Sequence, residues 1–428
     1  MNPSSNPKGI EGENFVNNIA NNNFLEYWCY PSPKDEKGDK KEICDLLIIF
    51  QNILIIVSVK NYDFKGDYDR YFNKTIEKAL KQIQGAERKL FSTKETYFKH
   101  PKKEIELFKK NKYSKIFRII VNLGSGLKFY HPSAYTKSNH HVTIMDRSTW
   151  SSIVNEMNTI IDFTNYLTER ENLLKQKNVL MLTCADNELD VEIFSKVNEY
   201  LDETIRQNKK QVYISGNELD LLASYIKNSN SYSDELKSNE FQGMFFDINN
   251  VWKNFISTPE YLLKKHNDRE SFFIDNFVIE EIGYRNELKG LAEKLMSLSR
   301  FKRRIVSKHF FKFYKKYKNS SNNYLARVFT DVYKYGFIFV KYPKNLRGEQ
   351  LNNILLLAIE SFAVHTKYLK KDFILIAYCE DFKDLRYCNY ELLNSFSKKE
   401  EEEIMKNAKS LGWFSDSFKY RDINEKEY

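Results

Sequence analysis

The sequence predicts an α/β (α+β) protein whose N-terminal domain is built on a mixed central sheet. Two apolar runs, 42–50 and 53–60, are separated only by Gln51-Asn52, and their Ile and Val content is typical of strands joined by a tight hairpin. From about residue 148 the apolar spacing becomes mainly helical. A strand–helix–strand pattern over 336–379 then indicates a small α/β unit.

The elements around the hairpin follow from apolar spacing and turn residues. A short amphipathic helix is expected over 9–21, where Val16, Ile19 and Ala20 are apolar. The other elements expected here are a strand over 24–30, a polar loop over 31–41, a helix over 75–90, and strands over 115–123 and 142–145.

The rest of the chain reads as helices with a few strands. Asp146 or Ser148 can cap a long helix that runs to about Lys175. The later elements expected are short strands over 179–183 and 212–214, a strand over 336–342, a helix over 350–369, a strand over 372–379, and a charged surface helix over 398–411. These patterns predict three regions: a sheet domain over 1–147, a mainly helical region over 148–322, and the α/β unit over 323–428.

Composition indicates a folded protein with more than one domain. The 428 residues exceed the usual size of a single domain, and 42% of them are hydrophobic. No apolar run is long enough to span a bilayer or to serve as a signal peptide, so we expect a cytoplasmic protein with no membrane partner. P-loop, GxSxG and HExxH motifs are absent, which removes support for an ATPase, an esterase or a zinc protease. The five cysteines form no CxxC pair, which argues against a zinc ribbon or a disulfide framework: Cys29, Cys44, Cys184, Cys379 and Cys388.

The hairpin places an acid and an amine together. A two-residue turn pairs Phe50 with Ile53 and, counting outward, Asp45 with Ser58. Lys60 lies two residues beyond Ser58, so these three polar side chains share one face at one end of the hairpin. The other positions of both faces are apolar, with Cys44 on the opposite face, as in a sheet covered on both sides. Charged side chains in such a sheet require partners or a function.

An aspartate and a lysine at a sheet edge suit phosphodiester hydrolysis. The carboxylate of Asp45 is the kind of ligand that Mg²⁺ prefers, and the bound metal lowers the pKa of a water molecule. The ammonium group of Lys60 can orient that water or stabilise developing charge. The alternative is a structural Asp–Lys pair where the hairpin meets solvent, and spacing alone leaves both interpretations open.

The same stretch resembles the PD-(D/E)xK nuclease superfamily, whose members have a restriction-endonuclease-like fold. The segment GIEGENFV over 9–16 is similar to the G-x-x-x-E-x-x-V opening of such proteins. By this resemblance Glu13 is the helix acid, Asp45 the metal-binding aspartate and Lys60 the lysine. Gln82 matches the helical glutamine that follows the hairpin in many members. The resemblance covers residues 8–90 by motif, and extends to 147 by the order of elements.

The sequence departs from the superfamily pattern at one position. The superfamily usually has an acid two residues before the lysine, and this chain has Ser58 there. Some restriction enzymes with S-x-K take the missing carboxylate from the following helix, which makes Glu77 the candidate and Glu87 the weaker one. The resemblance implies that Glu13, Asp45 and the Val59 carbonyl bind Mg²⁺, with Mn²⁺ as a substitute. It implies an endonuclease that cleaves DNA, with RNA as the alternative, in restriction or antiviral defence. A catalytically inactive nucleic-acid-binding or scaffold protein is the competing interpretation.

A basic segment over 300–318 contains nine Lys and Arg residues and no acid, while the whole chain has a net charge of +9. Its cations alternate with aromatic residues, so we expect it to contact phosphates; a lysine-rich solvated helix face is the alternative. We also expect a protein partner or a homo-oligomer. The predicted nucleic-acid-binding residues are Lys302, Arg303, Arg304, Lys308, Lys312, Lys315 and Lys316.

Overall fold

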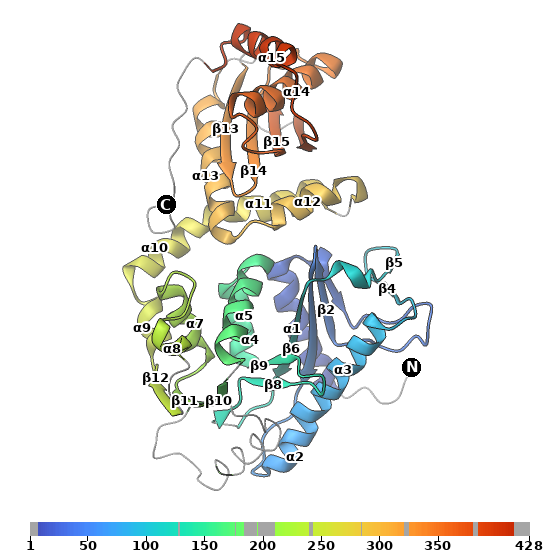
Figure 1. Cartoon of the computed structure of the whole chain (residues 1–428), viewed down its shortest axis with the longest axis vertical. Helices are drawn as coiled ribbons and strands as arrows, with labels where there is room; N and C mark the ends of the chain where they lie inside the picture. Colours follow the sequence, from blue (N-terminus) through green and yellow to red (C-terminus); the bar gives the residue numbers. More distant parts are fainter. Residues whose placement is uncertain are drawn as a thin grey trace. The chain divides into compact units, whose positions relative to one another are not determined.

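The computed structural model describes two compact units of mixed α/β structure, Met1–Leu263 and Lys264–Tyr428 (Figure 1). The predicted fold class is confirmed at this level. The boundaries expected after residues 147 and 322 fall inside these units. The residues described are 7–126, 129–175, 177–183, 195, 210–238, 243–283, 285–320, 325–379 and 384–414, so Cys184 lies outside them.

A six-stranded sheet in the order β1-β2-β3-β6-β9-β8 forms the centre of the first unit. Strands β3, β6 and β9 are parallel, whereas β1–β2, β2–β3 and β8–β9 are antiparallel pairs. The sheet is therefore mixed, as expected. Its strands are β1 (Cys29–Pro31), β2 (Leu46–Phe50), β3 (Ile53–Lys60), β6 (Lys115–Asn122), β8 (Ser133–Tyr135) and β9 (His141–Asp146). A separate two-stranded ribbon is formed by β4 (Tyr97–Lys99) and β5 (Ile105–Leu107).

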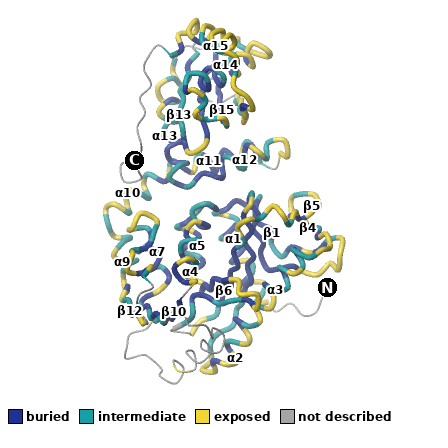
Figure 2. The backbone as a smooth tube through the Cα atoms, viewed as in Figure 1, coloured by how far each residue is buried: buried dark blue, intermediate teal, exposed yellow. Residues whose placement is uncertain are grey.

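The hairpin has the predicted register. Phe50 pairs with Ile53 and Leu46 with Val57, and Gln51 turns the chain with a φ of 50°. Figure 2 shows the central strands buried along nearly their whole length. Strand β2 begins at Leu46, however, so the strict alternation of faces does not extend to Cys44. That cysteine belongs to the same core cluster as Leu47, which corrects the expectation that it points to the opposite face.

Helices cover both faces of this sheet. Helix α3 (Lys78–Phe91) packs its Ala86 and Leu90 against β2 and β3 on one face. It continues from α2 (Tyr68–Phe72) through one wide turn over Asn73–Glu77. On the other side α1 (Pro7–Phe24) and α4 (Arg147–Glu156) pack against the sheet, and Phe163 of α5 (Ile160–Leu174) contacts both helices (Figure 1).

The long helix expected from residue 147 to 175 is two helices. Asp146 caps α4 as predicted by accepting a hydrogen bond from the Thr149 amide. Thr159 then caps α5, because its side chain accepts from the Asp162 amide, and this interrupts the helical chain.

A second sheet follows in the same unit, in the order β12-β11-β10-β7. The strands expected near 179–183 and 212–214 are present, whereas β7 and β12 were not predicted. The strands of this sheet and the helices near it are β7 (Phe129–Tyr130), β10 (Lys177–Leu182), β11 (Lys210–Ser215), α7 (Glu218–Lys227), α8 (Asp234–Lys237), β12 (Gly243–Asp247) and α9 (Val251–Ile256). Helix α10 (Pro259–Asp268) contains the boundary between the two units.

The second unit contains a four-stranded sheet in the order β13-β14-β15-β16. Phe310 and Phe313 of α13 contact the aromatic residues Phe339 and Tyr378 of the sheet. Helices α14 and α15 pack with β14 and β15 in a separate hydrophobic cluster. The predicted strand–helix–strand is β14–α14–β15, and the edge strands β13 and β16 were missed. The elements are α11 (Phe272–Phe277), α12 (Lys289–Met296), α13 (Arg300–Tyr317), β13 (Ala326–Val332), β14 (Tyr335–Lys341), α14 (Gly348–His365), β15 (Asp372–Cys379), β16 (Asp384–Glu391) and α15 (Lys398–Ser410). No helix in the described ranges has both the length and the apolar character needed to cross a bilayer.

Candidate active site

Asp45 and Lys60 converge at one end of the β2–β3 hairpin. Asp45 directly precedes β2, and Lys60 is the last residue of the antiparallel β3. The Lys60 Nζ lies 3.9 Å from the Asp45 Oδ2, and each side chain is about one-tenth exposed. The same Asp45 oxygen accepts a hydrogen bond of 2.5 Å from the Val59 amide. The structure thus brings the predicted acid and amine together.

The Lys60 ammonium group is held by three acceptors. It donates to the Ser58 hydroxyl at 3.0 Å, to the Val59 carbonyl at 2.8 Å, and to the side-chain carbonyl of Gln82 on α3. Ser58 also donates to that Gln82 oxygen at 2.9 Å. Ser58 and Gln82 are therefore part of the site, and the Val59 carbonyl predicted to bind metal is occupied by Lys60. Burial lowers the pKa of Lys60, while the charge of Asp45 opposes that shift.

Glu13 on α1 belongs to the same electrostatic cluster. Partial burial raises the pKa of Glu13, and the negative charge of Asp45 raises it further. The charge of Lys60 and a hydrogen bond with the Ser32 side chain oppose this increase. The charges of Asp45 and Lys60 thus both act on Glu13, whereas the binding of a metal by Glu13 and Asp45 stays a prediction.

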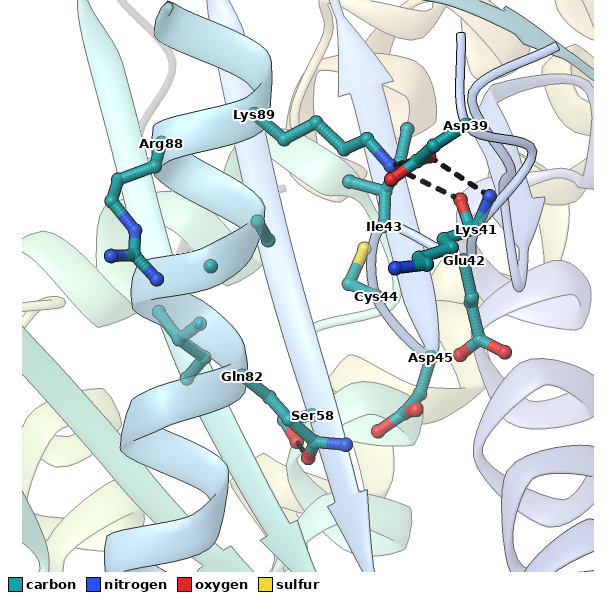
Figure 3. A pocket seen from close by; sticks show the side chains of 13 residues that line it. Asp39, Lys41, Glu42, Ile43, Cys44, Asp45, Ser58, Gln82, Arg88 and Lys89 are labelled. Carbon is teal, nitrogen blue, oxygen red and sulfur yellow. Dashed lines mark hydrogen bonds and ion pairs between the residues drawn. The ribbon is translucent and has the colours of Figure 1, made fainter.

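Glu42 is a carboxyl that the sequence analysis missed. Burial and the neighbouring Asp45 raise the pKa of Glu42 to about 7, and a hydrogen bond with the Asp45 side chain and the charge of Glu13 contribute to the increase. Figure 3 shows the Glu42 and Asp45 side chains, which both come from the segment that leads into β2. The sequence contains little indication that Glu42 belongs to the site, because this residue was the first of a predicted strand. The strand begins only at Leu46, which leaves Glu42 on an extended segment beside the site.

Neither helix glutamate proposed as the missing carboxylate reaches the site. Glu77 forms an ion pair of 2.7 Å with Lys81 and is 43% exposed. Glu87 forms an ion pair of 2.5 Å with Arg118. Both predictions are corrected: these acids pair with nearby cations.

The carboxyl groups of Glu13, Glu42 and Asp45 are the candidate ligands for a divalent cation. Glu13, Glu42 and Asp45 interact as like charges, and Lys60 is the cation beside them. In the part of the chain that the structure describes, no three His, Cys, Asp or Glu side chains are arranged to enclose a metal ion. Mg²⁺ requires fewer protein ligands, because it usually keeps several waters and binds one or two carboxylates. Asp45 and Glu13 can supply these, with Glu42 adjacent.

The basic segment predicted to bind nucleic acid is only partly available. Arg303 forms an ion pair of 2.6 Å with Asp275, and Arg304 one of 3.1 Å with Asp268. The two arginines are 2% and 1% exposed, so the prediction that they contact phosphates is wrong.

The lysines of the same helix have different surroundings. The Lys302 ammonium lies over the Tyr333 ring at 3.9 Å, and Lys308 is half-buried. Lys312, Lys315 and Lys316 are exposed on α13, and their contact with nucleic acid stays a prediction.

No family model, curated protein or solved structure matches this chain.

Proposed function

We propose that the first unit is a metal-dependent nuclease that hydrolyses phosphodiester bonds. The proposal depends on one observation, the meeting of Asp45 and Lys60 beside two further carboxyl groups at one end of the β2–β3 hairpin. An acid and an amine that are both about one-tenth exposed, as Asp45 and Lys60 are, are more typical of a functional site than of packing alone. The superfamily resemblance extends the proposal to DNA as the substrate, with RNA as the alternative, and to restriction or antiviral defence.

Each side chain of the site has a role in this reaction. A bound Mg²⁺ lowers the pKa of a coordinated water and offsets negative charge on the phosphate. Asp45 and Glu13 would provide carboxylate oxygens for this ion, and the Val59 amide fixes the orientation of Asp45. The Lys60 ammonium can donate to the attacking water or to a phosphate oxygen.

Ser58 and Gln82 position that lysine. Both accept hydrogen bonds from the Lys60 ammonium, and Ser58 is itself bonded to Gln82. Ser58 therefore supports the amine, at the position where the superfamily usually has an acid. Glu42, next to Asp45, is our candidate for the third carboxylate.

Cleavage assays on the full chain test this proposal. Plasmid DNA, single-stranded DNA and RNA are incubated with MgCl₂, MnCl₂ or EDTA. We expect cleavage with either metal and none with EDTA. Asp45→Asn and Lys60→Met should each reduce the rate by roughly a hundredfold or more, the scale of one lost transition-state contact.

Glu77→Gln is the matched control, because this acid pairs with Lys81 away from the site. It should retain wild-type activity. Cleavage that survives unchanged in Asp45→Asn and Lys60→Met would contradict the proposal. A thermal melt of each variant separates lost chemistry from lost stability, which is the outcome expected of a purely structural pair.

The second candidate function is nucleic-acid binding without cleavage. It is favoured by the replacement of the usual acid with Ser58 and by the hydrogen bond of Lys60 to the Val59 carbonyl. In that case the wild-type chain would bind labelled DNA or RNA with no cleavage in Mg²⁺ or Mn²⁺. Asp45→Asn would then leave the affinity unchanged or increase it, since it removes a negative charge.

A further inference from the structure

A groove lies beside the candidate site, between helix α3 and the segment 39–45 (Figure 3). We call it the α3 groove. Its volume is about 660 Å³, within the usual range for ligand pockets. Asp45 and Ser58 lie at one end, and Asp39 and Lys89 lie at the other. A chain bound in the groove would therefore lead directly to the candidate active site.

The lining of the α3 groove combines apolar groups with three cations and three carboxylates, and the carboxylates are Asp39, which pairs with Lys89, and the site residues Glu42 and Asp45. Its apolar lining includes Ile43, Ile83 and Ala86. Lys41 and Arg88 are exposed lining residues that add positive charge. Nucleotides carry both kinds of chemistry, because a base has an apolar face and a phosphate is anionic.

Gly85 provides a second, independent observation that bears on ligand binding in the α3 groove. It lies inside α3 and lines the groove, although glycine weakens a helix interior relative to alanine. Its φ is not among the positive values of this chain, so the backbone does not require glycine. A Cβ atom built at Gly85 would meet no described atom within 4 Å, so packing within the described residues does not require glycine either. Glycine at this open position leaves room for a ligand beside the helix, and one methyl group at the same position would take up little of that room.

We propose that the α3 groove binds an unpaired nucleotide of a single-stranded nucleic acid, next to the phosphate at Asp45 and Lys60. This inference rests on the proposed nuclease function and specifies its substrate as a single strand. An unpaired base can cover the apolar lining while its phosphates approach Lys41 and Arg88. A duplex would leave that lining uncovered, because its bases are stacked inside the helix and its phosphates face outward.

Binding measurements on two Gly85 variants test the inference. Fluorescence anisotropy of labelled oligodeoxythymidine, and of a mixed-sequence duplex of the same length, is measured in EDTA so that no cleavage occurs. Gly85→Leu fills the groove, and it should weaken single-strand binding by roughly tenfold or more, which corresponds to about 1.4 kcal/mol of lost binding free energy. The affinity for duplex should stay unchanged. Gly85→Ala is the matched control and should bind the single strand like the wild type.

Arg88→Gln gives a second measurement that leaves the helix interior intact. It should weaken single-strand binding and reduce its dependence on salt. Thermal melts establish that each variant is folded. If Gly85→Leu binds the single strand as tightly as the wild type does, or if the wild-type chain does not bind it, the inference is overturned. Equal weakening of single-strand and duplex binding would also overturn it, because the occupant would then be a duplex.

The two proposals fail in different ways. Loss of the single-strand preference contradicts the groove assignment, and leaves metal-dependent cleavage at Asp45 and Lys60 intact. Absence of cleavage together with Gly85-sensitive binding contradicts the nuclease, and leaves the groove assignment intact.

Discussion

Replacing Glu218 with glutamine should destabilise the first unit by about 3–5 kcal/mol, because it leaves a buried guanidinium without its counter-charge. Arg170 on α5 and Glu218 on α7 are both fully buried. The guanidinium donates to both Glu218 oxygens and also to the Pro132 carbonyl and the Thr143 hydroxyl. Glutamine has nearly the volume of glutamate, so the loss reflects charge and hydrogen bonding with no new cavity.

Urea and thermal unfolding, followed by circular dichroism, measure this loss. For a unit of this size the melting temperature should fall by roughly 6–20 °C, at about 2–4 °C per kcal/mol. Glu169→Gln is the control, because its 3.8 Å pair with Lys237 is partly exposed and should contribute less than about 1 kcal/mol. A loss below about 1 kcal/mol for Glu218→Gln would refute the reasoning about buried charge. A double variant, Arg170→Met with Glu218→Leu, should recover much of the stability, since it removes both charges.

Three further predictions concern the site, α3 and α13. Glu42 has a pKa of about 7 in the folded chain against an ordinary value of 4.5. Its protonated carboxyl therefore favours the folded chain below pH 4.5, and this contribution to stability is lost as the pH rises to 7. Glu42→Gln should therefore show a smaller loss of melting temperature over that interval than the wild type, and parallel curves would contradict the assignment. Gly85→Ala should raise the free energy of unfolding by about 1 kcal/mol in urea titrations, and a decrease would show that the helix needs glycine. Changing Lys312, Lys315 and Lys316 together to glutamate should weaken nucleic-acid binding and lessen its salt dependence, by roughly 0.9 in logarithmic slope for each lost phosphate contact. An unchanged slope would mean that these lysines form only a solvated helix face.

Local patterns were sufficient to predict the hairpin and the strand–helix–strand of the second unit. The two-residue turn at Gln51-Asn52 pairs Phe50 with Ile53 and so fixes the register of both strands, and the structure has that register. Edge strands such as β16 were missed because its alternation of polar and apolar residues does not resemble the continuous apolar run of a central strand.

The roles of the basic and acidic side chains were harder to predict. Spacing predicted a mainly helical region that includes 300–318, and α13 lies there. It did not indicate that Asp268 and Asp275 would pair with Arg304 and Arg303, because those acids lie on elements that only tertiary packing brings close.

The sequence by itself determined the pairing of β2 with β3 and hence the meeting of Asp45 with Lys60. A two-residue turn fixes which residues pair along the whole length of both strands. Tertiary structure decided which other groups joined them. Gln82 reaches Lys60 because α3 packs on that face of the sheet, whereas Glu77, one turn earlier, pairs with Lys81 in solvent. Side chains brought together from separate elements depend on how those elements pack, and a one-dimensional pattern contains little of that information.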